Sequence, residues 1–470
     1  MERAWDLCEE GMVINMNICE IIRKQRVFFE TGTTKQIGFR MAALIRLEQA
    51  LIAWEPEIKE ALWLDLHKSD FESYMAEIAL VKEEIKFVKK HLAGWAKPHP
   101  VNVSLSQLPA RTFSIAEPYG DVLIMAPWNY PVLLCLNPLV DAIAAGNCVV
   151  LKPSAYAPHV SSILKDMLGS IYPSKFVAVM EGGRTVNSEL LEQRFDYIFF
   201  TGGVEVGRLV LEKAAVHLTP ATLELGGKSP CIVDETADLS LAARKIVFGK
   251  IINAGQTCVA PDYILVKREK KDALLDCLKK ELICRLGNAP LDNPDYPSIV
   301  NEHHFNRLLG LIQGESIAWG GRFDTTSHRI APVILDDVTL NSPVMQEEIF
   351  GPIFPVIAYD NHKDLQRIIH HFEKPLAFYL FTKKRAMKDW ALREFSFGGG
   401  CINDTILHLT SPTMPFGGVG GSGMGSYHGE QGFETFSHRK SIVDKCLKFD
   451  NPLRYHPYTE IKDMLLHFLL

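Results

Sequence analysis

The stretch Phe199–Gly207, with the sequence FFTGGVEVG, decides how this chain folds. It joins a short apolar run, typical of a buried strand, through two glycines to a segment with apolar residues on one helical face. Such a junction places backbone N–H groups at the positive end of a helix dipole, where an anion such as a phosphate binds. A tight turn that needs glycine for steric reasons explains the same letters. The stretch therefore predicts a βα unit and leaves nucleotide binding open.

The same pattern repeats on both sides of this stretch. Short apolar runs recur roughly every 20–30 residues with helix-length segments between them, as in βαβ units. These runs are Val122–Met125, Cys148–Leu151, Phe176–Met180, Tyr197–Phe200 and Thr222–Leu225. Parallel strands that are buried on both faces have this continuous apolar character. We therefore predict a doubly wound α/β sheet across residues 121–225.

The rest of the chain extends this α/β pattern. Residues 1–100 show helical periodicity, and residues 101–117 alternate as an exposed hairpin or edge ribbon does. Residues 398–403 and 415–432 are glycine-rich and are expected to be loops. A short amphipathic helix is predicted near the C-terminus and is too short to span a bilayer. Further strands are expected at Cys231–Val233, Tyr263–Val266, Ile353–Ile357 and Ala377–Phe381.

Composition excludes several classes of function. The 470 residues include 50 Lys and Arg against 56 Asp and Glu, a net charge of −6, without the basic excess that nucleic-acid binding needs. The ten cysteines are scattered without a CxxC pair, which is typical of reduced intracellular thiols and predicts no metal site. The N-terminus lacks the plan of a signal peptide. We expect a soluble, cytoplasmic protein of two or three domains.

Cys258 is the candidate nucleophile. It lies in the sequence NAGQTCVA, among small and polar residues that leave a sulfur accessible to a substrate. Most single cysteines are inert core residues, and that remains the alternative for Cys258. Cys135, Cys148 and Cys231 lie in apolar runs and are expected to be of this inert kind.

Three further polar residues follow predicted strands, at the edge where ligands bind in such sheets. Desolvation of Glu224, within TLELGGK, would raise its pKa to suit a general base, although an ion pair with Lys228 is the alternative. The amide of Asn129, within the stiff loop APWNYP, suits an oxyanion hole or an Asx-turn. Lys152 ends a strand, where it can meet a nucleotide or simply lie in solvent.

Taken together, these motifs resemble the aldehyde dehydrogenase superfamily, and most closely its class 3 branch, which acts on fatty and aromatic aldehydes. The matching segments run in family order over nearly the whole chain: Ala126–Pro131, Lys152–Ser154, Phe200–Gly207, Glu224–Pro230, Gly255–Pro261, Glu347–Pro352 and Pro415–Gly425. The resemblance implies oxidation of medium- or long-chain aliphatic or aromatic aldehydes to carboxylic acids with NAD or NADP. The implied route is a cysteine thiohemiacetal, hydride transfer to nicotinamide, and hydrolysis of a thioester.

The resemblance also implies a role for each site residue. Cys258 would be the nucleophile, Glu224 the base that activates water, and Asn129 an oxyanion donor beside the Cys258 N–H. Tyr130 and Phe248 would line the substrate tunnel. Lys152 would hold the adenosine ribose, Gly202–Gly207 the pyrophosphate, and Glu348 the nicotinamide ribose. The full set of expected cofactor-binding residues is Trp128, Lys152, Gly202, Gly203, Gly207, Glu348 and Phe350.

An aldehyde dehydrogenase-like architecture follows from the same resemblance: two doubly wound α/β domains plus a small β oligomerisation ribbon. The ribbon would join two subunits in a homodimer. The tail helix would cap the tunnel or contact a membrane surface peripherally. Residues 1–15 have no counterpart and are expected to be a disordered extension. The expected division is residues 1–100 and 118–225 for the NAD(P)-binding domain with its N-terminal helices, 226–412 for the catalytic domain, 101–117 and 433–447 for the ribbon, and 448–470 for the tail.

Two departures from the family pattern concern the cofactor. At residue 155 the family usually has a glutamate, which repels the 2′-phosphate of NADP. This chain has Ala155 instead, which predicts that NADP is accepted or preferred. Gly203 stands where serine is frequent, which predicts modestly weaker cofactor binding.

Other functions remain open at this stage. Cys258 and Glu224 would also serve a cofactor-independent thiol hydrolase of the nitrilase, amidase or esterase kind. A catalytically silent binding protein and an acyl transfer to coenzyme A are lesser alternatives. The nucleotide-type residues Lys152, Gly202–Gly207 and Glu348 favour the dehydrogenase, because a hydrolase needs no nucleotide pocket.

Overall fold

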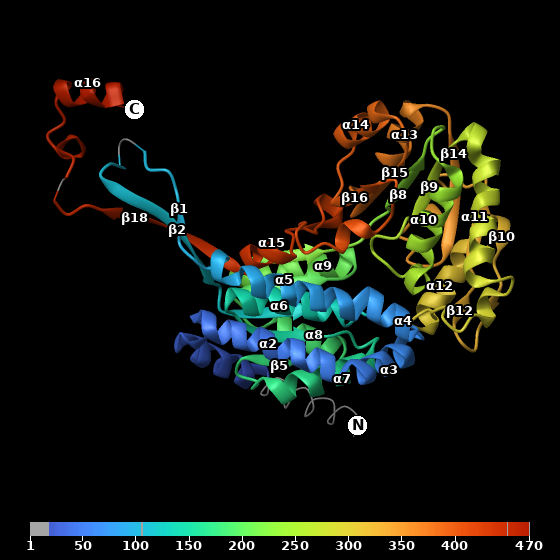
Figure 1. The fold of residues 1–470 in the computed structure, drawn as a ribbon, viewed down its shortest axis with the longest axis horizontal. Coiled ribbons are helices and arrows are strands. Elements are labelled where there is room, and N and C mark those ends of the chain that lie inside the picture. Colours follow the sequence, from blue (N-terminus) through green and yellow to red (C-terminus); the bar gives the residue numbers. More distant parts are fainter. Residues whose placement is uncertain (1–17, 105–106, 449, 470) are drawn as a thin grey trace, which may run out of the picture.

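The protein is built from two α/β bodies and a projecting β ribbon (Figure 1). This computed structural model describes residues 18–104, 107–448 and 450–469. The expectation of disorder at residues 1–15 falls outside these ranges. The layered sheets and the small ribbon confirm the predicted fold class.

The first body is a six-stranded sheet in the order β17-β7-β6-β3-β4-β5. All pairs are parallel except β17, which runs antiparallel to β7. Every residue of β3, β4 and β6 is buried, as expected for parallel strands that are covered on both faces. The five predicted strands of this region are confirmed. The bounds are β3 (Asp121–Met125), β4 (Cys148–Lys152), β5 (Val177–Val179), β6 (Tyr197–Thr201), β7 (Ala221–Glu224) and β17 (Gly423–Met424).

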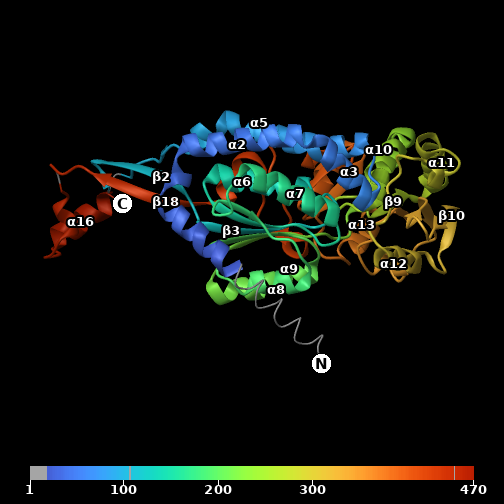
Figure 2. The same cartoon turned by 90° about the horizontal axis from the view of Figure 1, so that it is seen from below.

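Helices cover both faces of this sheet (Figure 2). The helices α6 and α7 lie on one face, with α2, α3 and α5 outside them, and α8 and α9 lie on the other. Residues 18–30 form a further helix, whose Ile18 and Ile22 pack into the core on the α8 side. The predicted helical character of the first hundred residues is confirmed for the described ones. The bounds are α2 (Ile37–Ala53), α3 (Glu55–Leu66), α4 (Asp70–Ser73), a π-helical turn (Tyr74–Ile78), α5 (Ala79–Trp95), α6 (Leu133–Ala145), α7 (Pro158–Ile171), α8 (Arg184–Leu191) and α9 (Val204–His217).

The second body is a seven-stranded sheet in the order β10-β13-β14-β9-β8-β15-β16. The four strands that were expected here, β8, β9, β14 and β15, are confirmed. Helices α10 to α14 pack around the sheet. The bounds are β8 (Pro230–Val233), α10 (Leu239–Ile251), β9 (Tyr263–Lys267), α11 (Lys271–Leu286), α12 (Glu302–Ile312), β10 (Ser316–Gly320), β11 (Phe323–Asp324), β12 (Arg329–Ile330), β13 (Val333–Asp336), β14 (Ile353–Tyr359), α13 (His362–Ile369), β15 (Ala377–Phe381), α14 (Arg385–Glu394) and β16 (Gly399–Ile402).

The strand β16 corrects one expectation, because residues 398–403 were predicted to be a loop. The strand pairs in parallel with β15. A Cβ atom at Gly400 would collide with the carbonyl oxygen of Phe378, so the two backbones approach too closely for a side chain. Glycine here permits close packing of a strand rather than a turn.

The ribbon consists of the antiparallel strands β1 (His99–Pro100), β2 (Ala110–Pro118) and β18 (Ser437–Lys445). It projects from the first body in Figure 1. The strand β18 begins at Ser437 rather than near residue 433, because Gly429–Thr435 form the helix α15. This helix and β17 also replace part of the loop that was expected over residues 415–432.

The chain ends in the predicted amphipathic helix, α16 (Glu460–Leu469), which lies near the far end of the ribbon (Figures 1 and 2). Its apolar side chains are exposed. These are Ile461, Met464, Leu465, Leu466 and Phe468. None of the helices in the described ranges combines the length and the apolar character that crossing a membrane requires.

Candidate active site

Cys258 lies in a tight turn between α10 and β9. Asn253 and Ala254 both have a positive φ of 50°, and a Cβ atom at Gly255 would collide with the carbonyl oxygen of Gly351. This compact backbone leaves the Cys258 side chain half-buried rather than enclosed in the core. The thiol borders two separate cavities. A molecule in either cavity can therefore reach the same sulfur atom.

The first cavity, which we call the sheet-edge cavity, lies at the carboxyl ends of β3, β6 and β7 and has a volume of about 1180 Å³. The rings of Trp128 and Phe350 meet edge to face in its wall, with centroids 5.4 Å apart. The predicted residues that line it are Trp128, Asn129, Gly202, Gly203, Glu224, Cys258, Glu348 and Phe350. Sequence reasoning missed His304 and Arg307, which also line it.

The residues of the sheet-edge cavity fit a dinucleotide. Gly203 is the N-cap of α9, and no described atom lies within 4 Å of the position that a Cβ would take there. The N–H groups and dipole of this helix are therefore open to a pyrophosphate. A Cβ at Gly226 would overlap the Glu348 carboxylate, which closes the other end of the cavity. The acidic residue in the first turn of α9, Glu205, is paired with Arg208 at 2.8 Å.

Two predicted cofactor residues lie away from the lining among the described residues. The Lys152 ammonium donates to the carbonyl of Pro153 at 2.6 Å, and burial lowers its pKa to about 8. It is buried rather than solvated, with 3% of its surface exposed. Gly207 faces the sheet instead, where a Cβ would lie 2.8 Å from Leu225 Cδ2. Its observed function is to let α9 approach β7.

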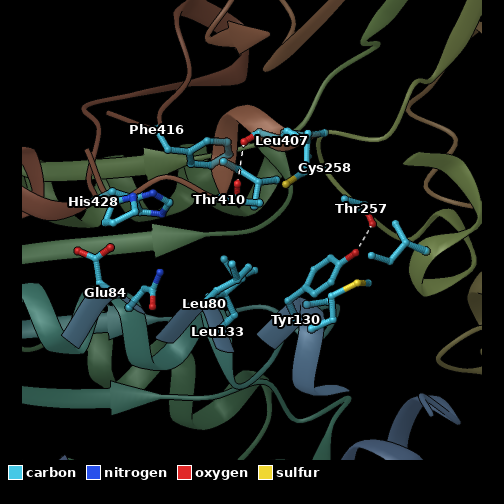
Figure 3. A pocket seen from close by; sticks show the side chains of 18 of the residues that line it. Leu80, Glu84, Tyr130, Leu133, Thr257, Cys258, Leu407, Thr410, Phe416 and His428 are labelled. Carbon is cyan, nitrogen blue, oxygen red and sulfur yellow. Dashed lines mark hydrogen bonds between the residues drawn. The ribbon is translucent and has the colours of Figure 1, made fainter. Parts of the chain in front are cut away.

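The second cavity, which we call the apolar tunnel, borders Cys258 (Figure 3). It is lined mostly by apolar side chains from α5, α6, α10 and the loop before α15. The hydroxyl groups of Tyr130 and Thr257 share a hydrogen bond of 2.6 Å beside Cys258. Both Tyr130 and Phe248 line the tunnel, where they were expected.

Glu224 is a buried carboxyl group without a partner. Its side chain is 2% exposed, and within the described part of the chain neither of its oxygens accepts a hydrogen bond. Burial raises the pKa of Glu224 well above its usual value. The alternative of an ion pair with Lys228 is wrong, because the Lys228 ammonium binds Asp262 at 2.5 Å. Glu224 is therefore available to hold or take a proton.

The thiol of Cys258 is protonated at neutral pH in this arrangement. Burial and the nearby carboxyl groups of Glu348 and Glu224 raise its pKa to about 12. Burial, with Asp262 nearby, raises the pKa of Glu348 to about 8. Since the thiolate is the nucleophile, removal of this proton must precede attack on a substrate.

Asn129 connects the first body to the nucleophile turn. Its amide donates to the carbonyl of Gln256 at 3.0 Å, two residues before Cys258. Its own carbonyl accepts from Asn253 at 2.7 Å and from the Lys68 ammonium at 3.2 Å. The amide is thus fixed across the two bodies rather than in a local Asx-turn. A side-chain amide carries two donors, and within the described residues the Asn129 amide donates to Gln256 alone.

A buried ion pair behind Asn129 was missed by sequence reasoning. The Lys68 ammonium lies 2.6 Å from Glu77, and both side chains are 0% exposed. The second oxygen of Glu77 accepts the N–H groups of Val132 and Leu133 at the start of α6, at 2.8 Å and 3.2 Å. Glu77 lies in the π-helical turn, a distortion that is frequent at functional sites. Lys68 and Glu77 are charged residues between helical segments, and nothing in the local sequence indicates that they are buried.

A half-buried thiol between a dinucleotide-type cavity and an apolar tunnel is the arrangement expected of a nucleotide-dependent oxidoreductase. The aldehyde dehydrogenase family model matches residues 16–442, and the chain belongs to that family. It is 44% identical to the 4,4'-diaponeurosporen-aldehyde dehydrogenase of Staphylococcus aureus, over 94% of this chain and 97% of that one. It is 43% identical to the dimeric NADP-preferring aldehyde dehydrogenase of Mus musculus, over 94% and 98%.

Solved structures agree with this assignment. The substrate-bound state of Staphylococcus aureus AldH superposes with a TM-score of 0.95 at 42% identity, covering 96% of this chain and 99% of that one. Class 3 is confirmed by relatives such as family 3 member B1 of Rattus norvegicus, at 44% identity over 93% and 94% of the two chains. The protein oxidises aldehydes to carboxylic acids with NAD or NADP, and the hydrolase alternative is not favoured.

Proposed function

We propose that Cys258 is the nucleophile of this aldehyde oxidation, and that the apolar tunnel supplies medium- or long-chain aliphatic or aromatic aldehydes to it. The observation that carries the proposal is the position of the sulfur, where the sheet-edge cavity and the apolar tunnel meet. A substrate carbonyl and a dinucleotide reach one atom from opposite sides there. The apolar walls favour aldehydes with extended hydrocarbon parts, because binding removes apolar surface from water.

The chain's own residues divide the chemistry between them. Glu224 takes the proton of the Cys258 thiol and passes it to water, and the sulfur bonds to the carbonyl carbon, which gives a thiohemiacetal. The free amide N–H of Asn129 and the Cys258 N–H stabilise the oxyanion that forms. NAD or NADP, held by the residues of the sheet-edge cavity, would supply the acceptor for the hydride of this carbon. Glu224 then takes a proton from the water that attacks the thioester, and the acid leaves as the thiol is restored.

The cofactor is proposed to lie in the sheet-edge cavity. The α9 N-terminus would hold the pyrophosphate, Glu348 the nicotinamide ribose, and Trp128 and Phe350 the apolar walls. Lys152 is proposed to bind the adenosine ribose. Gly207 is proposed to let α9 approach β7 closely. We propose a preference for NADP, because the loop after β4 carries the exposed Ala155 instead of a carboxylate that would repel a 2′-phosphate.

The division of the chain is proposed to match its three largest sheets. The six-stranded sheet would bind the cofactor, the seven-stranded sheet would carry the nucleophile, and the ribbon would join two subunits. A relative at 43% identity is named as dimeric, which supports a homodimer. The exposed apolar side chains of α16 support a peripheral membrane contact of an otherwise cytoplasmic enzyme, or a cap over the tunnel.

One panel of assays tests these assignments. Aliphatic and aromatic aldehydes are supplied with NAD or NADP, and reduced nicotinamide is followed by absorbance. We expect turnover that rises with the apolar length of the aldehyde, and a kcat/KM for NADP at or above that for NAD. A value for NADP far below that for NAD would overturn the cofactor preference. Ester hydrolysis without cofactor reduction would overturn the proposed chemistry.

Two measurements test the ribbon and the tail. Sedimentation should give about twice the chain mass of 52.8 kDa, and a monomer would contradict the dimer. Deletion of residues 448–470 should change the chain-length preference or the binding to lipid vesicles. Unchanged values of both would remove the proposed role of α16.

A further inference from the structure

The apolar tunnel has one polar end, which the chemistry at Cys258 does not use. Figure 3 shows Cys258 and Tyr130 at one side of the tunnel, and Glu84 and His428 together at the other. Asn137 also lines the tunnel. These polar residues come from separate elements: Glu84 from α5, Asn137 from α6, and His428 from the residue before α15. Asn137 stands one turn of α6 before Asp141, a neighbour of Glu84, so the fold gathers polar groups on the side of the tunnel away from Cys258.

Asn137 shows that this end is incomplete as the protein stands. Its side chain is 3% exposed, and its Oδ1 has no hydrogen-bond partner among the described residues. A buried polar atom without a partner costs about 1–3 kcal/mol, so it needs an explanation in a native fold. An amide group both donates and accepts, and it lines a cavity that can hold a ligand. The missing partner is expected to come from the occupant of the tunnel.

The charges at this end select the kind of occupant. Glu84 is 2% exposed and accepts the N–H of Gly429 at 2.6 Å, and burial raises its pKa to about 7. Behind it, burial and the Glu84 carboxyl raise the pKa of Asp141 well above its usual value. This carboxyl pair therefore keeps at least one proton at neutral pH. Burial lowers the pKa of His428 to about 4, so its ring is neutral.

An uncharged group that both donates and accepts matches this set best. A carboxylate would meet the acidic pair, and no described residue that lines the tunnel is a lysine or arginine that could offset its charge. An ammonium group would lose its hydration along the apolar walls, and of the two carboxyl groups only Glu84 lines the tunnel to receive it. A hydroxyl group can donate to the unpartnered Asn137 Oδ1 and accept from a neighbouring N–H or O–H without this penalty.

The geometry points to a binding subsite at Glu84, Asn137 and His428 for a hydroxyl group at the far end of the aldehyde. The substrates it selects are ω-hydroxy aldehydes with an apolar chain between the two ends. This inference rests on the proposed function, in which the tunnel receives the substrate and Cys258 the aldehyde. Ordered water is the competing occupant, because water also satisfies buried polar groups.

Paired substrates test the subsite. Unbranched alkanals and the ω-hydroxyalkanals of the same chain length are compared across a series of lengths, with NADP in excess. We expect the ratio of kcat/KM, hydroxy over plain, to rise to about tenfold at the length at which the hydroxyl reaches Asn137, as one hydrogen bond provides. The ratio should fall at shorter and longer chains.

Asn137→Leu is the variant that removes the amide at nearly the same volume. It should bring the ratio close to one, whatever its effect on the plain alkanals, because the ratio compares two substrates of the same variant. Leu133→Met, which alters an apolar wall residue of the same helix, should change both members of each pair alike. Protection of the unmodified enzyme against heat by alkanediols, more than by alkanols of equal length, should show the same preference without turnover.

Specific results would overturn the subsite. A ratio at or below one at every length would assign the polar end to water, and so would equal protection by diols and alkanols. A preference for ω-carboxy aldehydes, or an unchanged ratio in Asn137→Leu, would also overturn it. Turnover of plain alkanals in these cases would leave the proposed function standing. Failure of every aldehyde would overturn the proposed function, and the subsite with it.

Discussion

Replacing Glu77 with glutamine should impair both stability and turnover, although Glu77 touches neither cavity among the described residues. The Lys68 ammonium lies 2.6 Å from Glu77 in a fully buried pair. After the substitution, the ammonium would keep two contacts, with the Asn129 carbonyl at 3.2 Å and with the face of the Tyr130 ring at 4.4 Å. Neither partner carries a compensating full charge. We expect the ammonium to pull the Asn129 carbonyl toward it and so displace the loop that carries Asn129, the proposed oxyanion donor.

The magnitude follows from the burial of the pair. Removal of one partner from a buried ion pair costs about 3–5 kcal/mol, which is a large part of the 5–15 kcal/mol typical of a folded protein. Loss of an oxyanion donor costs about 10²–10³ in kcat. A displaced Asn129 would lose only part of this oxyanion stabilisation, so we expect kcat to fall by about 10–100-fold. The KM for NADP should change little, because the α9 N-terminus is not attached to this pair.

Calorimetry and initial rates with a long-chain alkanal measure the two effects. Glu83→Gln is the matched control, since Glu83 forms an exposed pair with Lys86 at 3.7 Å and should lose less than about 1 kcal/mol. Adding Lys68→Met to Glu77→Gln should recover part of the stability, because no charge stays uncompensated, but not the kcat. The reasoning is refuted if Glu77→Gln matches Glu83→Gln in melting temperature and keeps wild-type kcat.

Three further predictions concern other parts of the molecule. Cys258→Ser should lose nearly all reduction of nicotinamide while Cys277→Ser, on α11, keeps it; equal activity of both would contradict the assigned nucleophile. The pKa of Glu348 is raised to about 8 in the folded protein, so the folded state holds this proton more tightly than the unfolded state does. This contribution to the stability of the fold is lost as the pH rises through 8. Glu348→Gln should therefore gain about 4 kcal/mol on wild type between pH 5 and pH 9 by calorimetry, and a constant difference would count against the burial. Gly400→Ala should lower the melting temperature because of the Phe378 carbonyl, whereas Gly169→Ala, with open space around it, should not; equal shifts would refute the close approach.

The strands of the first body could be predicted because parallel strands that are buried on both faces read as continuous apolar runs. The same signal located β8, β9, β14 and β15. It failed for β16, where Gly399 and Gly400 resemble a turn although they allow two backbones to pack closely. Composition alone cannot separate these two uses of glycine.

The candidate site was predictable where its residues stand in recognisable motifs, as Cys258 does before β9 and Glu224 does at the end of β7. Contacts between distant segments were not predictable, because each local sequence offers a nearer partner. Lys228 stands four residues from Glu224 but binds Asp262, and the Asn129 amide reaches Gln256 across 127 residues. The buried Lys68 carries a charge that sequence patterns assign to solvent.

One measurement tests the central claim, that the sulfur of Cys258 bonds to the substrate, most directly. Glu224→Gln enzyme is mixed with a long-chain alkanal and NADP, quenched in acid and digested with trypsin. The peptide of residues 251–267 lies between Lys250 and Lys267 and contains Cys258 as its single cysteine. Mass spectrometry should find this peptide heavier by one acyl group, because the thioester forms but its hydrolysis is slowed. An unmodified peptide, or an acyl group on another cysteine, would contradict the account.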